Sequence, residues 1–308
     1  MNKVSIVMCT YNGATFLREQ LDSIFRQTHP ADEIIIQDDS STDSTIEIIK
    51  EYAQYPIRLY QNKERLGYDR NFTSALLKAT GDYILISDQD DIWADNKIET
   101  LLTNIGEYSL IFHNSLLFKE IEYPLRTRHT GIPTTYPPFI TIKPYIPGHE
   151  IMFRKEALTY LKQLEQYEFS YDYILSTICA NLKGAKFLNA SLTYWRRHTN
   201  AATFVPDSQH SRIAGYIKAL VSLTNRAHRK TAHNYFTLLK RLPVNDPTSK
   251  SIIARMSTGS IIDIFSTCFT CMKQHHRFYP ASGKATGILR SFFLPMIFIR
   301  DYSKFILK

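Results

Sequence analysis

Short apolar runs alternate with helix-like patterns along the first hundred residues of the chain. Four of these runs are continuous, which predicts strands that are buried on both faces. Such strands, when helices separate them, are typical of a parallel sheet covered on both sides, so the pattern predicts an α/β fold. The expected strands lie at residues 4–8, 34–36, 57–60 and 83–86, and the expected helices lie near residues 16–25, 46–49 and 72–79.

Polar side chains gather where three of the expected strands end. In doubly wound sheets, ligands bind at the carboxyl ends of the strands. The sequence therefore predicts a nucleotide-type pocket at that edge, with acidic residues able to hold a metal. The three polar clusters are Thr10-Tyr11-Asn12, Asp38-Asp39 and Asp88-Gln89-Asp90-Asp91.

The Asp88–Asp91 cluster carries the strongest chemical signal. Alternate carboxylates on a turning chain can converge on one hard cation, such as Mg²⁺ or Mn²⁺, through oxygen ligands. The alternative is an acid-rich helix N-terminus, because a helix is expected to begin near Ala94. For Asp38 and Asp39, the alternative to ligand binding is helix capping and solvation of the loop.

The middle of the chain, residues 106–200, is less regular and rich in proline, with helices expected at 156–166 and 173–182. Beyond residue 205 the pattern becomes helical and basic. Since 44% of the 308 residues are hydrophobic, the chain can fill a sizeable core and does not resemble a disordered coil. No run reaches the roughly 20 apolar residues that a bilayer requires, and the N-terminus lacks the parts of a signal peptide. With four cysteines, a reducing cytosol is the expected compartment.

The net charge of +8 conceals a gradient along the chain. Residues 1–105 carry 10 basic and 17 acidic side chains, a net charge of −7. Residues 201–308 carry 16 basic and 4 acidic side chains, a net charge of +12. Two pieces with different partners are therefore expected. The basic charge alone would suit a nucleic acid, but no recognition motif supports that partner, and none is expected.

Several segments in this order resemble glycosyltransferase family 2. They are VSIVMCTYNG, IIIQDDSSTDST, GDYILISDQDD and, more weakly, YDYILS and YWRRHTNAAT. The resemblance implies a GT-A-like (Rossmann-like) fold, with a mixed, mostly parallel sheet flanked by helices. It also implies an inverting, metal-dependent transferase that uses a nucleotide diphosphate-sugar. The catalytic domain is expected at residues 1–205, followed by a mostly α-helical, basic region at 206–308.

The resemblance also implies roles for individual residues. The donor nucleotide is expected at the strand ends, with Arg70 approaching the diphosphate. The metal is expected at the acidic motif, with Asp90 as a direct ligand and His198 close to it. Asp172 aligns with the general base. The donor residues are Thr10, Tyr11, Asn12, Asp39, Arg70 and Asp88, and the metal residues are Asp88, Asp90 and His198.

The residue types suit this chemistry. Inverting transfer needs a base that deprotonates the acceptor hydroxyl as it attacks the anomeric carbon, and it needs no enzyme nucleophile. A cation stabilises the charge that develops on the leaving diphosphate. The alternatives are that Asp172 caps a helix and that His198 is an ordinary surface or core histidine.

The basic region suggests contact with a membrane. Residues 212–241 and 289–299 place apolar side chains among basic ones, and such segments can lie in the interface of an anionic membrane. The alternative is a helical subdomain with solvated basic faces. The resemblance favours the membrane, because many such enzymes extend glycans on undecaprenyl-diphosphate lipids. The expected location is the cytoplasm, peripherally on the inner face of the cell membrane.

The expected function is sugar transfer to a glycan or lipid-linked glycan acceptor in bacterial surface polysaccharide synthesis, such as capsule or O-antigen, with rhamnosyltransferases among the enzymes it resembles. One alternative is a nucleotidyltransferase, which would need a Gly-rich phosphate loop after the first strand. Another is a non-catalytic protein that binds sugar nucleotides or membranes. A zinc site at Cys268, Cys271, His275 and His276 is disfavoured, because the cysteines fall within an apolar helical run.

Overall fold

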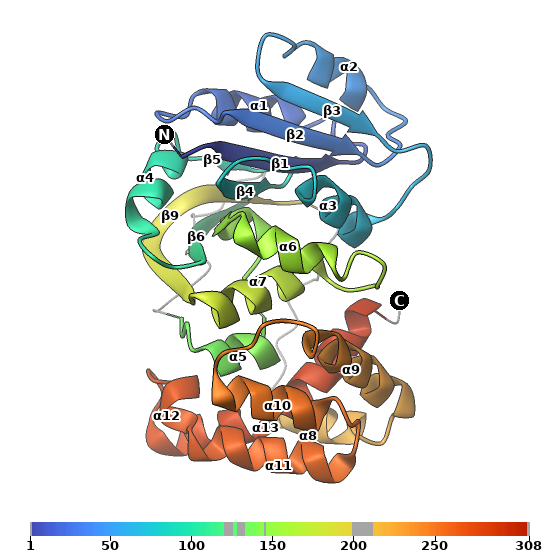
Figure 1. Ribbon diagram of the computed structural model, residues 1–308, viewed down its shortest axis with the longest axis vertical. Helices are drawn as coiled ribbons and strands as arrows, with labels where there is room; N and C mark the ends of the chain where they lie inside the picture. Colours follow the sequence, from blue (N-terminus) through green and yellow to red (C-terminus); the bar gives the residue numbers. More distant parts are fainter. Residues whose placement is uncertain (1, 120–125, 128–132, 145, 199–211, 307–308) are drawn as a thin grey trace. The chain divides into compact units, whose positions relative to one another are not determined.

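A computed structural model describes residues 2–119, 126–127, 133–144, 146–198 and 212–306 of the chain (Figure 1). The chain divides into two compact units. Unit 1 comprises Met1–Pro133, Ile146–Cys179 and Lys183–Phe204. Unit 2 comprises Thr134–Tyr145, Ala180–Leu182 and Val205–Lys308. The boundary expected at residue 205 lies outside the described residues.

Unit 1 is built on a mixed sheet whose first four strands are parallel to one another. In the described residues the strands follow the order β3-β2-β1-β4-β8-β6-β9-β5, with β7 paired to β6. Strand β8 runs antiparallel to both β4 and β6, whereas β6 and β9 are parallel. The strands are β1 (Val4–Thr10), β2 (Glu33–Asp38), β3 (Ile57–Gln61), β4 (Tyr83–Ser87), β5 (Ile92–Trp93), β6 (Leu110–Lys119), β7 (Arg126–Thr127), β8 (Ile151–Arg154) and β9 (Ala185–Arg197).

Helices cover both faces of this sheet, as the continuous apolar strands predicted. On one face, Ile6 and Met8 of β1 pack in a core with Leu21 of α1 and with residues of α2 and α4. Figure 1 shows α3, α6 and α7 on the opposite face from α1. The helices of unit 1 are α1 (Leu17–Phe25), α2 (Thr45–Lys50), α3 (Tyr68–Leu76), α4 (Lys97–Asn104), α6 (Glu156–Lys162) and most of α7 (Tyr171–Leu182), with a 3₁₀ turn at Gly148–Glu150.

Unit 2 is helical in its described part. Its longest helix, α13 (Lys284–Ile306), packs against α8 (Arg212–Ser222), α9 (Arg226–Leu239) and α11 (Ile261–Lys273). Two helix starts carry the expected caps, since Asn225 accepts backbone N–H groups of α9 and Asp246 caps α10. The other helices are α5 (Pro137–Ile142), α10 (Pro247–Met256) and α12 (His275–Phe278).

For the apolar run at residues 289–299, the structure favours the helical subdomain over the membrane interface. It forms the middle of α13, where Leu294 and Met296 are fully buried. Phe298 of the same run packs against Tyr235 of α9, with ring centroids 5.1 Å apart. The run is apolar because it fills the core of unit 2, which leaves most of its side chains unavailable to lipid.

No helix in the described residues combines the length and apolar character needed to cross a membrane. The predicted architecture is otherwise confirmed: a mostly parallel sheet flanked by helices, followed by a helical C-terminal region. Two helices begin earlier than the spacing indicated, α3 at Tyr68 and α7 at Tyr171. Conversely, the helix expected from Ala94 begins at Lys97, because the short strand β5 follows the acidic segment.

Candidate active site

The carboxyl ends of β1, β2 and β4 meet at one edge of the sheet. Thr10 pairs with Asp38 in the parallel register of β1 and β2, and Met8 of β1 pairs with Ser87 of β4. The Thr10 hydroxyl donates to Asp38 Oδ2 over 2.7 Å, and both side chains are buried. The polar segments that follow these strands therefore begin side by side, as the sequence predicted.

The loop after β1 is held by side chains from the neighbouring loops. Gln89 accepts from Tyr11 N through Oε1 (2.9 Å) and donates to Tyr11 O through Nε2 (3.1 Å). Asn12 has a left-handed backbone (φ 46°), which asparagine tolerates better than most residues. Its side chain accepts from Thr42 N over 2.8 Å. Asn12 thus shapes the loop, while the Tyr11 ring lies 3.9 Å from the Arg65 guanidinium.

Asp39 organises the loop that precedes α3. Its buried carboxylate accepts from Asn62 Nδ2 (2.8 Å), Leu66 N (2.7 Å) and Gly67 N (2.9 Å). Each of these bonds compensates part of the cost of burying the charge. Asp39 is therefore fixed at the site edge, and its predicted role in binding the donor nucleotide stays a prediction.

The acidic segment after β4 separates into two neighbouring groups. Asp90 Oδ2 lies 2.8 Å from His198 Nε2, which brings together two of the predicted metal residues. Asp88 Oδ2 instead lies 3.3 Å from His149 Nδ1. The ligand atoms of Asp88, Asp91 and His149 lie within 4.8 Å of one another, a spacing that can hold one metal ion.

Sequence analysis did not assign His149 to the metal. The pairing of β8 with β4 brings it there, because Met152 aligns with Leu85 in an antiparallel register. The turn that precedes β8 consequently lies beside the residues that follow β4. The sequence offered only one signal, the segment Gly148-His149-Glu150 directly before an apolar strand.

Asp91 is only partly satisfied by hydrogen bonds in this acidic group. Asp91 is fully buried, and its Oδ1 accepts from Arg196 N over 3.0 Å, while Oδ2 has no hydrogen-bond partner among the described residues. Burial, opposed by the charge of His149 and assisted by the charges of Asp88 and Asp90, raises the pKa of Asp91 to about 8. An orphaned buried carboxylate oxygen beside a second carboxylate and an imidazole fits a divalent cation.

Two opposing effects act on the pKa of His149. Burial lowers its pKa, but the hydrogen bond to Asp88 and the charges of Asp91, Asp88 and Glu150 outweigh burial and raise it. Its backbone carbonyl accepts from the buried Lys97 ammonium over 2.8 Å.

Lys97 itself is fully buried, although the sequence carries no signal for this. Its ammonium also donates to Thr193 Oγ1 over 2.9 Å and lies 3.8 Å from the centroid of the Trp93 ring. Burial lowers the pKa of Lys97 to about 7, against the raising effect of nearby carboxylates. This lysine therefore holds in place the turn that carries His149.

Asp172 lies in the first turn of α7, beside the acidic group. Its Oδ1 accepts from Tyr173 N (2.9 Å) and Ser170 Oγ (3.1 Å). Burial raises its pKa to about 7, and the charge of Asp69 adds to this effect. Asp88 also raises the pKa of Asp172, so the predicted base and the acidic group share one electrostatic environment.

A close contact links the His149 turn to α7. Tyr171 is fully buried and stacks on Phe72, with ring centroids 4.5 Å apart. A Cβ atom at Gly148 would lie 2.1 Å from the Tyr171 hydroxyl oxygen. Only glycine therefore permits this approach, which places the metal-side turn and the base-bearing helix together.

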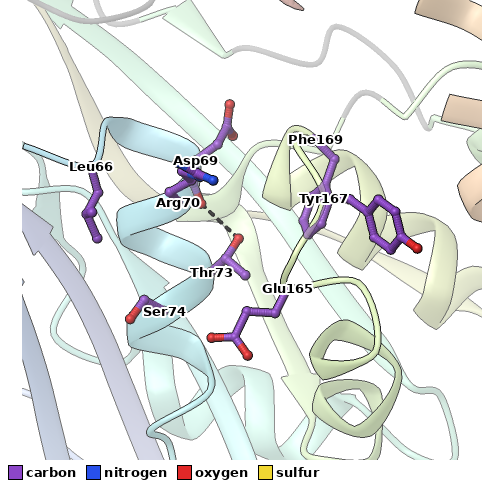
Figure 2. Close-up of a pocket in the computed structure, with 8 residues that line it drawn as sticks. All are labelled: Leu66, Asp69, Arg70, Thr73, Ser74, Glu165, Tyr167 and Phe169. Atoms are coloured by element: carbon purple, nitrogen blue, oxygen red, sulfur yellow. Dashed lines mark hydrogen bonds between the residues drawn. The ribbon is translucent and has the colours of Figure 1, made fainter. Parts of the chain in front are cut away.

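Arg70 lines a pocket that does not include the acidic group. It is exposed on α3 and lines a pocket of about 210 Å³, which Figure 2 shows between α3 and residues 165–169. Its predicted position at the diphosphate stays a prediction. The other lining residues are Leu66, Asp69, Thr73, Ser74, Glu165, Tyr167 and Phe169.

Comparison with known families agrees with the resemblance seen in the motifs. The sequence profile described as "Glycosyl transferase family 2" matches residues 5–161, half of the chain. That range holds the strand ends, the acidic segment and His149, and it ends before Asp172. The predicted family membership is confirmed.

Two curated relatives align with part of the chain. The putative glycosyltransferase EpsE of Bacillus subtilis is 34% identical over 168 residues, which cover 52% of this chain and 59% of EpsE. The Escherichia coli enzyme WfgD, a UDP-Glc:alpha-D-GlcNAc-diphosphoundecaprenol beta-1,3-glucosyltransferase, is 34% identical over 143 residues, which cover 42% of this chain and 56% of WfgD. The matched region thus spans little more than half of either relative.

Solved structures extend the likeness in fold over nearly the whole chain. Residues 1–349 of Staphylococcus aureus TarS, in complex with UDP-GlcNAc, give a TM-score of 0.55 at 14% identity, covering 99% of this chain and 91% of that one. The mannosyltransferase PcManGT of Pyrobaculum calidifontis, with GDP-Man and Mn²⁺, gives 0.53 at 16% identity, covering 97% and 87%. At such identities the likeness supports the fold alone, and it agrees with the GT-A-like architecture that the motifs implied.

Proposed function

Because the chain belongs to glycosyl transferase family 2, we propose that it transfers a sugar, with inversion, from a nucleotide diphosphate-sugar to a glycan or lipid-linked glycan acceptor. One observation carries the proposal: Asp172 and the Asp88–Asp91–His149 group occupy one electrostatic environment at the edge of the parallel sheet. In the proposed reaction, Asp172 would act as the base and the Asp88–Asp91–His149 group would hold the cation. WfgD acts on a diphosphoundecaprenol-linked acceptor, which suggests the same acceptor class in bacterial surface polysaccharide synthesis.

The chain's own residues divide the reaction into binding and proton transfer. Tyr11, with Arg65 against its ring, and the strand-end residues Thr10, Asn12 and Asp39 form the nucleotide side, with Arg70 near the diphosphate. The ionised Asp172 accepts the proton of the acceptor hydroxyl as that oxygen attacks the anomeric carbon and the nucleoside diphosphate departs.

On the metal side, Asp88, Asp91 and His149 would hold Mg²⁺ or Mn²⁺, with the Asp90–His198 pair adjacent. A bound divalent cation supplies positive charge against the departing diphosphate. The clustered carboxylates remain ionised more readily beside that charge, which offsets the raised pKa of Asp91.

Replacement of the base tests the proposal most directly. Asp172→Asn should lower the single-turnover rate by at least about 10²-fold, because the amide cannot accept the proton, while the thermal shift caused by the donor is retained. The donor is found first by a thermal-shift screen of nucleotide sugars with and without Mn²⁺. Wild-type turnover in Asp172→Asn would contradict the role of the base, and turnover that survives EDTA would contradict the metal.

The same assay separates the competing functions by their products. A glycosyltransferase releases a nucleoside diphosphate, a nucleotidyltransferase releases pyrophosphate, and a non-catalytic binding protein releases neither. We expect only the nucleoside diphosphate.

We also propose that unit 2 contacts the inner face of the cell membrane through α8, which would make the enzyme peripheral and cytoplasmic. Ile213, Ile217, Leu220 and Val221 lie on one stripe of this helix and are 47–70% exposed, with the exposed Lys218 beside them. An exposed apolar stripe with basic neighbours suits an anionic lipid surface. The double variant Ile217→Ser/Val221→Ser should lose pelleting with phosphatidylglycerol vesicles, whereas Ile262→Ser on α11 should not. Equal pelleting of the double variant and the wild type would overturn this contact.

A further inference from the structure

Ser170 occupies the N-cap position of α7, yet its hydroxyl does not cap the helix. Serine at this position usually accepts a backbone N–H from the first turn. Here Ser170 Oγ lies 3.2 Å from Asp69 Oδ1 and 3.1 Å from Asp172 Oδ1. One hydroxyl therefore stands between two carboxyl groups, one of which is the proposed base.

A hydroxyl has a single proton, so it can donate to only one of these carboxyl groups at a time. The second contact is a hydrogen bond only if that carboxyl is protonated and donates to Ser170 Oγ. All three groups are satisfied when the two carboxyls share one extra proton. Reversing both hydrogen bonds moves that proton from one carboxyl to the other.

The Asp69 carboxyl, which contacts the Ser170 hydroxyl, is held in place by a backbone hydrogen bond. It lies in the first turn of α3, and its Oδ1 also accepts from Tyr171 N over 3.1 Å. This bond ties α3 to the start of α7, so the distance between the two carboxyls is set by backbone on both sides. Asp69 also lines the pocket of Figure 2, together with Arg70 and Glu165, which gives it access to solvent.

We propose that Ser170 and Asp69 form a proton relay for Asp172, an inference that rests on the proposed role of Asp172 as the base. As the acceptor oxygen bonds to the anomeric carbon, its proton passes to Asp172, and the bond to the diphosphate oxygen breaks with its electron pair. Asp172 then gives a proton to Ser170 Oγ while the serine's own proton passes to Asp69. Asp69 releases a proton to water in the pocket, which regenerates the ionised base.

The electrostatics of the pair agree with such an exchange. Burial raises the pKa of Asp172 to about 7 and that of Asp69 to about 6. Both pKa values are raised from the usual range of a carboxyl group, so either carboxyl can hold a proton near neutral pH. From the other elements, Asp88 faces Asp172 and raises its pKa, as does Asp69. The phenols of Tyr68 and Tyr171 also lie close by, and burial raises the pKa of both, which keeps them neutral.

The experiment measures single-turnover transfer against pH for Asp69→Asn and Ser170→Ala, with Glu165→Gln as the control. Asp69→Asn keeps an acceptor for Tyr171 N but can neither carry the charge nor take up the relayed proton. The plateau rate should therefore fall about tenfold, and the acid limb of the rate profile should move to lower pH by roughly half a unit to one unit. Ser170→Ala should lower the rate about tenfold with the donor KM unchanged, and Ser170→Thr should restore it. Glu165→Gln removes a carboxylate from the same pocket without touching Ser170, so its profile should match the wild type.

The relay is overturned if either Asp69→Asn or Ser170→Ala turns over at the wild-type rate, or if Asp69→Asn leaves the acid limb in place. An equal shift of the acid limb in Glu165→Gln would also overturn the relay. The shift would then come from the loss of any carboxylate in the pocket and not from Asp69 in particular. Asp172→Asn in the same assay separates the two proposals. If Asp172→Asn is inactive while the relay variants behave as wild type, only the relay fails, whereas an active Asp172→Asn overturns the proposed base itself.

Discussion

The two units of this protein bury different kinds of side chain. In the described residues, all buried charged and imidazole side chains belong to unit 1, including Asp91, Lys97, His149 and Glu150. The buried polar residues of unit 2 are uncharged, and its core is formed by side chains such as Leu294. Burial of charge is costly unless partners compensate it, whereas burial of apolar area is favourable. Unit 1 therefore bears the energetic cost of buried charge, whereas unit 2 is stabilised mainly by its apolar core.

The core of unit 2 should show the largest effect on stability. Leu294→Ala removes a fully buried side chain from α13, and the cavity should lower the free energy of unfolding by about 2–5 kcal/mol. Urea unfolding followed by circular dichroism measures this loss. If unit 2 is only a scaffold, the donor-induced thermal shift should persist under conditions where the variant is folded. If Leu294→Ala were as stable as the wild type, burial of apolar side chains in α13 would not be what stabilises unit 2.

The buried lysine of unit 1 should show an intermediate effect. Lys97→Met keeps a similar volume but removes the ammonium donor from Thr193 Oγ1 and leaves His149 O with only the 3.5 Å contact to the Thr193 hydroxyl, at a cost of about 1–3 kcal/mol. It should also weaken the Mn²⁺-dependent thermal shift, because the His149 turn loses its support. If Lys97 contributed only to stability, Lys97→Met would lower the urea midpoint of unfolding and leave the Mn²⁺-dependent thermal shift unchanged.

The exposed stripe of α8 should show the smallest effect on stability. The double variant Ile217→Ser/Val221→Ser replaces side chains that are 59% and 60% exposed, so the free energy of unfolding should change by less than about 0.5 kcal/mol per site. A loss of vesicle binding in this variant would then reflect the surface itself. Destabilisation comparable to that of Leu294→Ala would instead mean that the stripe is part of a core.

Some site residues were accessible to sequence reasoning because local patterns carry them. Asp88 and Asp90 follow an apolar strand directly, and Asp172 begins a helix within a recognisable motif. His149 and Lys97 were missed for a common reason. The position of His149 depends on the register of β8 against β4, and Lys97 belongs to a helix whose pattern does not reveal that its ammonium is buried. The sequence left two interpretations of the run at 289–299 open, because a buried helix and an interfacial one have similar composition.

The sequence by itself determined the alternation of strands and helices, the edge of the sheet where acidic residues gather, the family and the separation of acidic from basic charge. These features depend on periodicity and on residues close together in the chain, which local patterns record. Only the tertiary structure decided that Asp91 and His149 join Asp88, that Lys97 supports them, and that Ser170 stands between Asp69 and Asp172. Those neighbours come from segments far apart in the chain, and their meeting is set by strand register and helix packing.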